Sequence, residues 1–116
     1  MASSHNILQW NCRGLKTNLD ELQQLMACHQ AAAVSVQETM SPTEIKIKGY
    51  SSYFCPSRGQ DGTSGGTALY VKEGIPHRSL SLNTNLQAVA VKITVGKPFT
   101  LCSIYMPWCE DRKSVV

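Results

Sequence analysis

The chain has 116 residues, with 11 lysines and arginines against 8 aspartates and glutamates, which gives a formal net charge of +3. This length allows one small domain rather than two, and a hydrophobic content of 42% excludes a disordered tail. No run approaches the roughly 20 apolar residues of a membrane helix, and residues 1–5 lack the start of a secretory signal. We therefore expect a nuclear or cytoplasmic protein that is not secreted and has no membrane partner. A charge of +3 does not by itself indicate a nucleic-acid partner.

The first half of the chain predicts a strand, a helix and a second strand. Residues Asn6–Asn11 form a short apolar run that ends in a turn at Gly14. A helix is predicted over Asn18–His29, with Asn18 as its N-cap and Glu21 three residues later as in a capping box. The compact apolar run Ala32–Gln37 predicts the next strand. This order is typical of a crossover unit whose two strands lie in one sheet.

The second half is β in character. A polar stretch with four glycines, residues 57–66, predicts a surface loop. Strands are predicted at Thr67–Val71, Gln87–Ile93 and Phe99–Tyr105, the last two joined by a turn at Gly96 into an antiparallel pair. One helix cannot cover the apolar faces of five or six strands. The pattern therefore predicts an incomplete α/β architecture.

Five cysteines offer no recognisable metal site or disulfide framework. Their number is odd and they form no CxxC pair; they are Cys12, Cys28, Cys55, Cys102 and Cys109. We expect reduced thiols, several of them acting as small buried hydrophobes.

Three polar side chains fall at the ends of predicted strands, where α/β sheets place their ligands. Asn11 and Glu38 follow neighbouring strands, and an amide oxygen beside a carboxylate suits a hard cation such as Mg²⁺. Tyr105 ends a third strand and could donate a hydrogen bond to a phosphate oxygen. Residues of these types are more often turn formers, solvated groups or half-buried packing residues. The spacing leaves both interpretations open.

Four motifs, in order, resemble those of the endonuclease/exonuclease/phosphatase superfamily. A strand ending in Trp-Asn is followed by a Gly-Leu turn, a Gln-Glu-Thr segment comes next, a glycine pair leads into a strand, and a Tyr-x-Pro follows; these are Ile7–Leu15, Val34–Thr39, Ser64–Val71 and Ile104–Pro107. The Trp-Asn-Cys-Arg-Gly-Leu form and the Gly-Ile-Pro-His stretch at 74–77 are most similar to the non-LTR (LINE-type) retrotransposon branch.

This resemblance implies the fold, the cofactor and the roles of individual residues. The fold would be an α/β two-sheet β-sandwich flanked by helices, with residues 1–107 as its N-terminal half and 108–116 as a divergent tail. Asn11 and Glu38 would bind Mg²⁺ (or Mn²⁺), Tyr105 would contact the scissile phosphate, and the partner would be DNA. Arg13, where several DNA-repair relatives carry an acid, is a candidate for substrate binding. We expect about one sheet of the sandwich, with an exposed apolar face open to the missing C-terminal half or to self-association.

The family's later motifs do not occur in this sequence. Gly-Asp-x-Asn, which activates the water and binds phosphate, and the final Ser-Asp-His are absent, and His5, His29 and His77 are expected at the surface. We therefore expect a fragment of a Mg-dependent DNA endonuclease of a mobile element, inactive alone and with a weak or absent metal. The alternatives are a non-catalytic nucleic-acid-binding module, a phosphodiesterase completed by another chain or a homodimer, and a lipid- or inositol-phosphate branch.

Overall fold

The computed structural model describes residues 6–57 and 65–105. They form the helix α1 (Leu15–Cys28) and the strands β1 (Asn6–Asn11), β2 (Ala31–Gln37), β3 (Tyr50–Cys55), β4 (Thr67–Lys72), β5 (His77–Leu80), β6 (Gln87–Val95) and β7 (Lys97–Tyr105). The predicted tail at 108–116, His5, Cys109 and the Met106–Pro107 part of the fourth motif lie outside the described residues. Across 6–57 and 65–105, no helix is long and apolar enough to cross a membrane.

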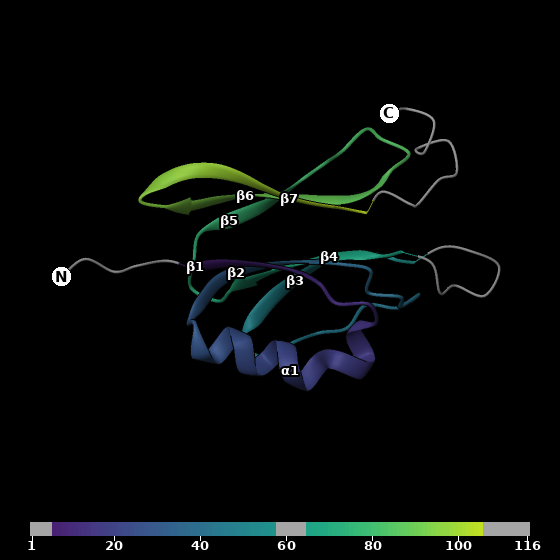
Figure 1. The fold of residues 1–116 in the computed structure, drawn as a ribbon. Helices are drawn as coiled ribbons and strands as arrows, with labels where there is room; N and C mark the ends of the chain where they lie inside the picture. The colour runs from purple at the N-terminus through teal and green to yellow at the C-terminus, as the bar shows by residue number, and fades with distance from the viewer. Residues whose placement is uncertain (1–5, 58–64, 106–116) are drawn as a thin grey trace, which may run out of the picture.

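The strands form two sheets in separate layers. One sheet has the order β1-β2-β4-β3, and the other has the order β5-β6-β7. Strand β1 precedes α1 in the chain and β2 follows it. The two strands are parallel neighbours in the sheet, as the crossover pattern predicts. Strands β6 and β7 form the predicted antiparallel pair. Figure 1 shows α1 along one face of the four-stranded sheet and the three-stranded sheet on its other side.

The helix begins earlier than its sequence signals predict. Its first residue is Leu15, and Gly14 is the N-cap, so the prediction of Asn18 as N-cap is wrong. The Leu15 amide donates to Thr39 O (2.9 Å), which starts the helix beside the end of β2. Asn18 lies inside α1 with a non-helical φ of −107°, and its side-chain amide donates to Cys12 O (2.7 Å) and Gly14 O (3.1 Å). Tertiary contacts therefore override the local capping signal.

One apolar core fills the space between α1 and the four-stranded sheet. The helix buries the predicted stripe of apolar side chains at Leu15, Leu22 and Met26 against Val34, Val36 and Tyr70 of the sheet. Strand β4 is buried along Thr67–Val71, because it lies inside its sheet and is covered on both faces.

A second apolar core joins the two sheets. Ala33, Leu69 and Val71 of the four-stranded sheet pack with Val91 and Ile93 of β6. The expectation that the chain supplies about one sheet, with that sheet's apolar face exposed, is therefore wrong. The sequence does not predict the three-stranded sheet, because β5 has the sequence His-Arg-Ser-Leu, in which apolar and polar residues do not alternate. Strand β5 forms by pairing with β6.

We predict that Ile93→Val lowers the free energy of unfolding by about 1 kcal/mol, because Ile93 is 1% exposed in the inter-sheet core. The control is Ile104→Val, which deletes the same methyl group from a side chain that is 43% exposed on β7 and should change stability by less than about 0.5 kcal/mol. Urea unfolding followed by circular dichroism measures both. Equal losses would contradict the packing of the three-stranded sheet against the four-stranded one.

Candidate active site

Asn11 and Glu38 meet at the carboxyl ends of the parallel strands β1 and β2. Asn11 lies opposite Gln37 in the register of the two strands, so the next residue, Glu38, lies beside it. The Asn11 side-chain amide donates to Glu38 Oε2 at 2.6 Å. The structure thus brings together the two side chains that the sequence predicts as metal ligands.

The backbone at Glu38 is held by hydrogen bonds on two sides. Its carbonyl accepts from the amide of Gly14 (2.8 Å) and from the thiol of Cys12 (3.5 Å). On the other side, the Thr39 amide donates to Gly66 O (3.1 Å). Glu38 itself has a φ of +57°, an uncommon conformation for a residue with a side chain. Such conformations persist where surrounding contacts fix them, and they are concentrated at functional sites.

Tyr105 reaches the same corner from the other sheet. Its ring packs on Gly65, where a Cβ would lie 2.5 Å from Tyr105 Cδ2 and where φ is +78°. Gly65 O in turn accepts from the amide of Met40 (2.8 Å), two residues after Glu38. Only a glycine lets the loop pass this close to the Tyr105 ring while adopting that φ.

The donor chemistry of the pair suits a hard divalent cation. The Asn11 NH₂ group is engaged by Glu38, which leaves the Asn11 amide oxygen and the remaining carboxylate oxygen as ligands. Mg²⁺ binds through one or two carboxylates and keeps several waters. The described residues contain no cluster of three His, Cys, Asp or Glu side chains able to hold a metal ion.

Arg13 lies exposed in the turn between β1 and α1, two residues after Asn11. Its φ of +50° places it, like Glu38, in the left-handed region. The turn places Arg13 at the end of the sheet where Asn11 and Glu38 lie. Its role in binding a substrate stays a prediction.

The two described histidines differ in their surroundings. His29 is exposed at the end of α1, as predicted. His77 is half-buried, contrary to the prediction of a surface residue: its Nε2 lies 2.7 Å from the Tyr53 hydroxyl and its Nδ1 lies 2.7 Å from Ile75 O. The Tyr53–His77 contact connects β3 of one sheet with β5 of the other.

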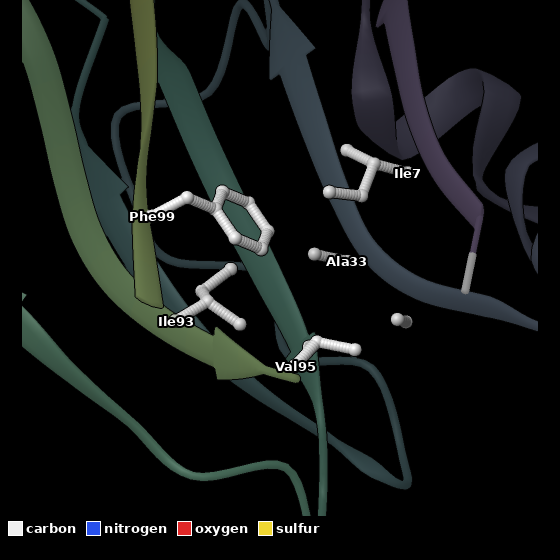
Figure 2. A pocket seen from close by; sticks show the side chains of 6 residues that line it. Ile7, Ala33, Ile93, Val95 and Phe99 are labelled. Atoms are coloured by element: carbon white, nitrogen blue, oxygen red, sulfur yellow. The ribbon is translucent and has the colours of Figure 1, made fainter. Parts of the chain in front are cut away.

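The opposite side of the stack is open and apolar. A groove with a cavity of about 180 Å³ lies there, lined by Ile7, Ala32, Ala33, Ile93, Val95 and Phe99. Figure 2 shows Ile93, Val95 and Phe99 facing Ile7 and Ala33 across the gap. Ile7, on the outermost strand β1, is 41% exposed. This groove is separate from the polar corner at Glu38, and its lining carries no chemical group suited to catalysis.

Three residues near the site were not predicted as part of it. Gln87 Oε1 accepts from the Gly66 amide at 2.5 Å, and Gln37 donates to the Ser103 hydroxyl at 2.9 Å. Gln37 stands inside the Gln-Glu-Thr motif, which could have signalled its role. The sequence around Gln87 and Ser103 does not indicate that they lie near the site, because their hydrogen-bond partners come from elements distant in sequence.

The described cysteines Cys12, Cys28, Cys55 and Cys102 are free thiols. Burial raises the pKa of the Cys12 thiol, an effect that outweighs the hydrogen bonds from the backbone at Gly14 and Cys12, which lower it. Cys12 is 3% exposed, whereas Cys28 is exposed at the end of α1.

We predict that iodoacetamide at pH 8 alkylates Cys12 at least about tenfold more slowly than Cys28, because the thiolate is the nucleophile and Cys12 is both protonated and covered. Because its pKa is raised, the Cys12 thiolate fraction and hence its rate should keep increasing above pH 9. Peptide mass spectrometry of timed samples measures both rates. Equal rates in the folded protein would contradict the burial of Cys12 beside Glu38.

Comparison with known proteins finds likeness in structure rather than in sequence. No protein-family model matches the chain, and no curated protein matches it. The endonuclease domain of TRAS1, a telomere-specific non-LTR retrotransposon, is similar with a TM-score of 0.69 and 22% identity, over 96% of this chain and 50% of that one. The AP endonuclease LMAP from Leishmania major is similar with a TM-score of 0.65 and 18% identity, over 87% of this chain and 40% of that one.

The chain thus spans half or less of the length of these two solved structures. The TM-scores of 0.65 and 0.69 establish the fold, whereas identities of 18% and 22% leave activity open. The four sequence motifs and the two structural neighbours agree, and one neighbour is of the non-LTR retrotransposon kind that the motifs predict. The described residues therefore have the α/β, two-sheet fold of these two endonuclease structures and form part of that fold.

Proposed function

We propose that this chain is the metal-binding half of a magnesium-dependent DNA endonuclease domain from a mobile element. The observation that carries the proposal is the Asn11–Glu38 pair, joined at 2.6 Å where two parallel strands end. The two structural neighbours, an AP endonuclease and a retrotransposon endonuclease domain, support it. The proposed reaction is hydrolysis of a phosphodiester, with nicking of target DNA.

Each residue of the corner has a proposed part in binding DNA. Glu38 and Asn11 would hold Mg²⁺, or Mn²⁺ in its place, through their oxygen atoms. The bound cation supplies positive charge against the negative charge that develops on the phosphate. Tyr105 donates its hydroxyl hydrogen to a non-bridging oxygen of the scissile phosphate. Arg13 contacts a neighbouring phosphate as a second cation.

We propose that these 116 residues do not cut DNA by themselves. They contain neither the Gly-Asp-x-Asn nor the Ser-Asp-His motif that the family resemblance requires for water activation and further phosphate contacts. On this proposal, residues 1–107 form the N-terminal half of the domain and 108–116 a divergent tail, in a nuclear or cytoplasmic protein. The apolar groove beside β1 and β7 would receive the rest of the domain, and a second copy of this chain is the alternative occupant.

Plasmid nicking and duplex binding together test the proposal. The chain alone should leave supercoiled plasmid uncut in Mg²⁺, while the TRAS1 endonuclease domain serves as the positive control. At constant ionic strength, Mg²⁺ should strengthen binding of a short duplex by the wild type. That gain should be lost in Glu38→Gln and kept in Glu73→Gln, which makes the same charge change at an exposed turn residue.

Each other outcome points to a different function. Nicking by the chain alone that requires Mg²⁺ and disappears in Glu38→Ala would make it a complete nuclease, through a homodimer or a site completed otherwise. DNA binding that weakens with salt but ignores Mg²⁺ would favour the non-catalytic nucleic-acid-binding module. Failure to bind DNA at all would contradict both proposals and leave the smaller phosphate esters as substrates.

A further inference from the structure

We infer that Gln37 and Ser103 are positioning residues, which fix Glu38 and Tyr105 against each other across the two sheets. The inference deepens the proposed function and rests on it, since the proposed function assigns Glu38 to the metal and Tyr105 to the phosphate. Neither Gln37 nor Ser103 is placed in contact with metal or DNA. They act indirectly, by holding Glu38 and Tyr105 in position.

A buried hydrogen-bonded bridge connects β2 with β7. Ser103 is fully buried on β7, and its hydroxyl donates to Val36 O of β2 at 2.9 Å. The same hydroxyl accepts from Gln37 Nε2 at 2.9 Å. Gln37 Nε2 also donates to Ser35 Oγ at 2.8 Å, a contact within β2 that does not join the two sheets. Ser103 is thus bonded twice to one strand of the opposite sheet.

The bridge lies next to both residues it would position. Gln37 directly precedes Glu38, and Ser103 precedes Tyr105 by two residues on the same face of β7. Elsewhere the two sheets meet through apolar side chains such as Leu69 and Val91 and, at the far edge, through the Tyr53–His77 contact. Apolar contact is non-directional, whereas paired hydrogen bonds in a buried setting specify one arrangement. The bridge therefore sets the register of the sheets at the end where the site lies.

A second set of contacts connects Tyr105 with the Gly65–Gly66 segment, whose carbonyl groups accept from the amides of Thr39 and Met40. Gln87 lies opposite Tyr105 in the β6–β7 register, and its Oε1 accepts from the Gly66 amide at 2.5 Å. The Tyr105 ring itself packs on Gly65. Movement of the end of β7 would disturb both contacts, so the position of the Tyr105 ring reports the state of the bridge.

Two serines provide a matched comparison, because Gln37 Nε2 donates to both and only one of them joins the sheets. Ser103 is fully buried on β7 and Ser35 is 3% exposed on β2. We expect Ser103→Ala to lose the nuclear Overhauser effects between the Tyr105 ring protons and Gly65 Hα in metal-free protein. Ser35→Ala should keep them. Gln37→Met, which keeps the side-chain length and removes the donor, should behave like Ser103→Ala and provides a second variant if one fails to fold.

Bound Mn²⁺ gives the second readout. Paramagnetic relaxation of the Tyr105 amide should change in Ser103→Ala while the Mn²⁺ midpoint stays that of the wild type, and Ser35→Ala should match the wild type in both. Unchanged Tyr105–Gly65 effects in Ser103→Ala and Gln37→Met would overturn the inference, as would equal losses in Ser35→Ala, which would reveal a merely structural role. If the wild type binds no Mn²⁺, the proposed metal function fails, and the metal-free measurement still decides the positioning role.

Discussion

Replacing Glu38 by glutamine should weaken Mn²⁺ binding at least about 100-fold, because it removes the negative charge of the Asn11–Glu38 pair while keeping its shape. Loss of a hydrogen-bonding partner outside the ligand set already weakens metal binding by roughly 10–100-fold, and a direct ligand should matter more. Asn11 cannot compensate, since its amide is neutral and donates to Glu38 Oε2. Titration of free Mn²⁺ by electron paramagnetic resonance measures the affinity.

The control for this prediction is Glu73→Gln. Glu73 is exposed in the turn after β4, and its replacement makes the same change in net charge. Its Mn²⁺ affinity should stay within about twofold of the wild type, because solvent and salt screen exposed charges. A loss of similar size in both variants would mean that Mn²⁺ is attracted by overall charge. An unaffected Glu38→Gln protein would place the cation elsewhere and remove the basis for the proposed function.

The part of the site built by neighbouring segments could be predicted from the sequence. Two apolar runs around a helical stripe predict a parallel pair, and parallel strands end at the same sheet edge. Asn11 and Glu38 are therefore expected side by side from the sequence, and the structure has their side chains in contact. The motif order extends the site to Tyr105, whose contact with Gly65 brings it to the same corner.

The parts that depend on packing between sheets could not be predicted. Strand β5 has no apolar alternation and forms because β6 offers a partner, so the three-stranded sheet and the second core were missed. Asn18 carries a sound capping signal, but the Leu15 amide is held by Thr39 O, and the helix starts there instead. Ser103 looks like any strand serine, and only its approach to Val36 O shows its connection to the site.

Gly66→Ala should destabilise the protein more than Ile93→Val does, through a clash inside the site. Gly66 has a φ of +89°, and a Cβ there would collide with Thr39 Oγ1 and lie 3.2 Å from the Ser57 amide nitrogen. The left-handed conformation costs an alanine about 1–2 kcal/mol, and overpacking a filled space adds roughly 1–3 kcal/mol. Urea unfolding followed by circular dichroism measures the total.

Gly74→Ala separates these two contributions. Gly74 has a similar φ of +94°, but a Cβ there would meet nothing within 4 Å, so the alanine variant carries the backbone strain alone. Gly66→Ala should exceed it by about 1–3 kcal/mol. The clash also displaces Thr39, whose backbone follows Glu38 and is bonded to Gly66 O, so Mn²⁺ affinity should fall in Gly66→Ala and stay unchanged in Gly74→Ala. If both variants lose the same stability and neither loses metal affinity, the close approach of the glycine loop to Thr39 does not support the metal-binding corner.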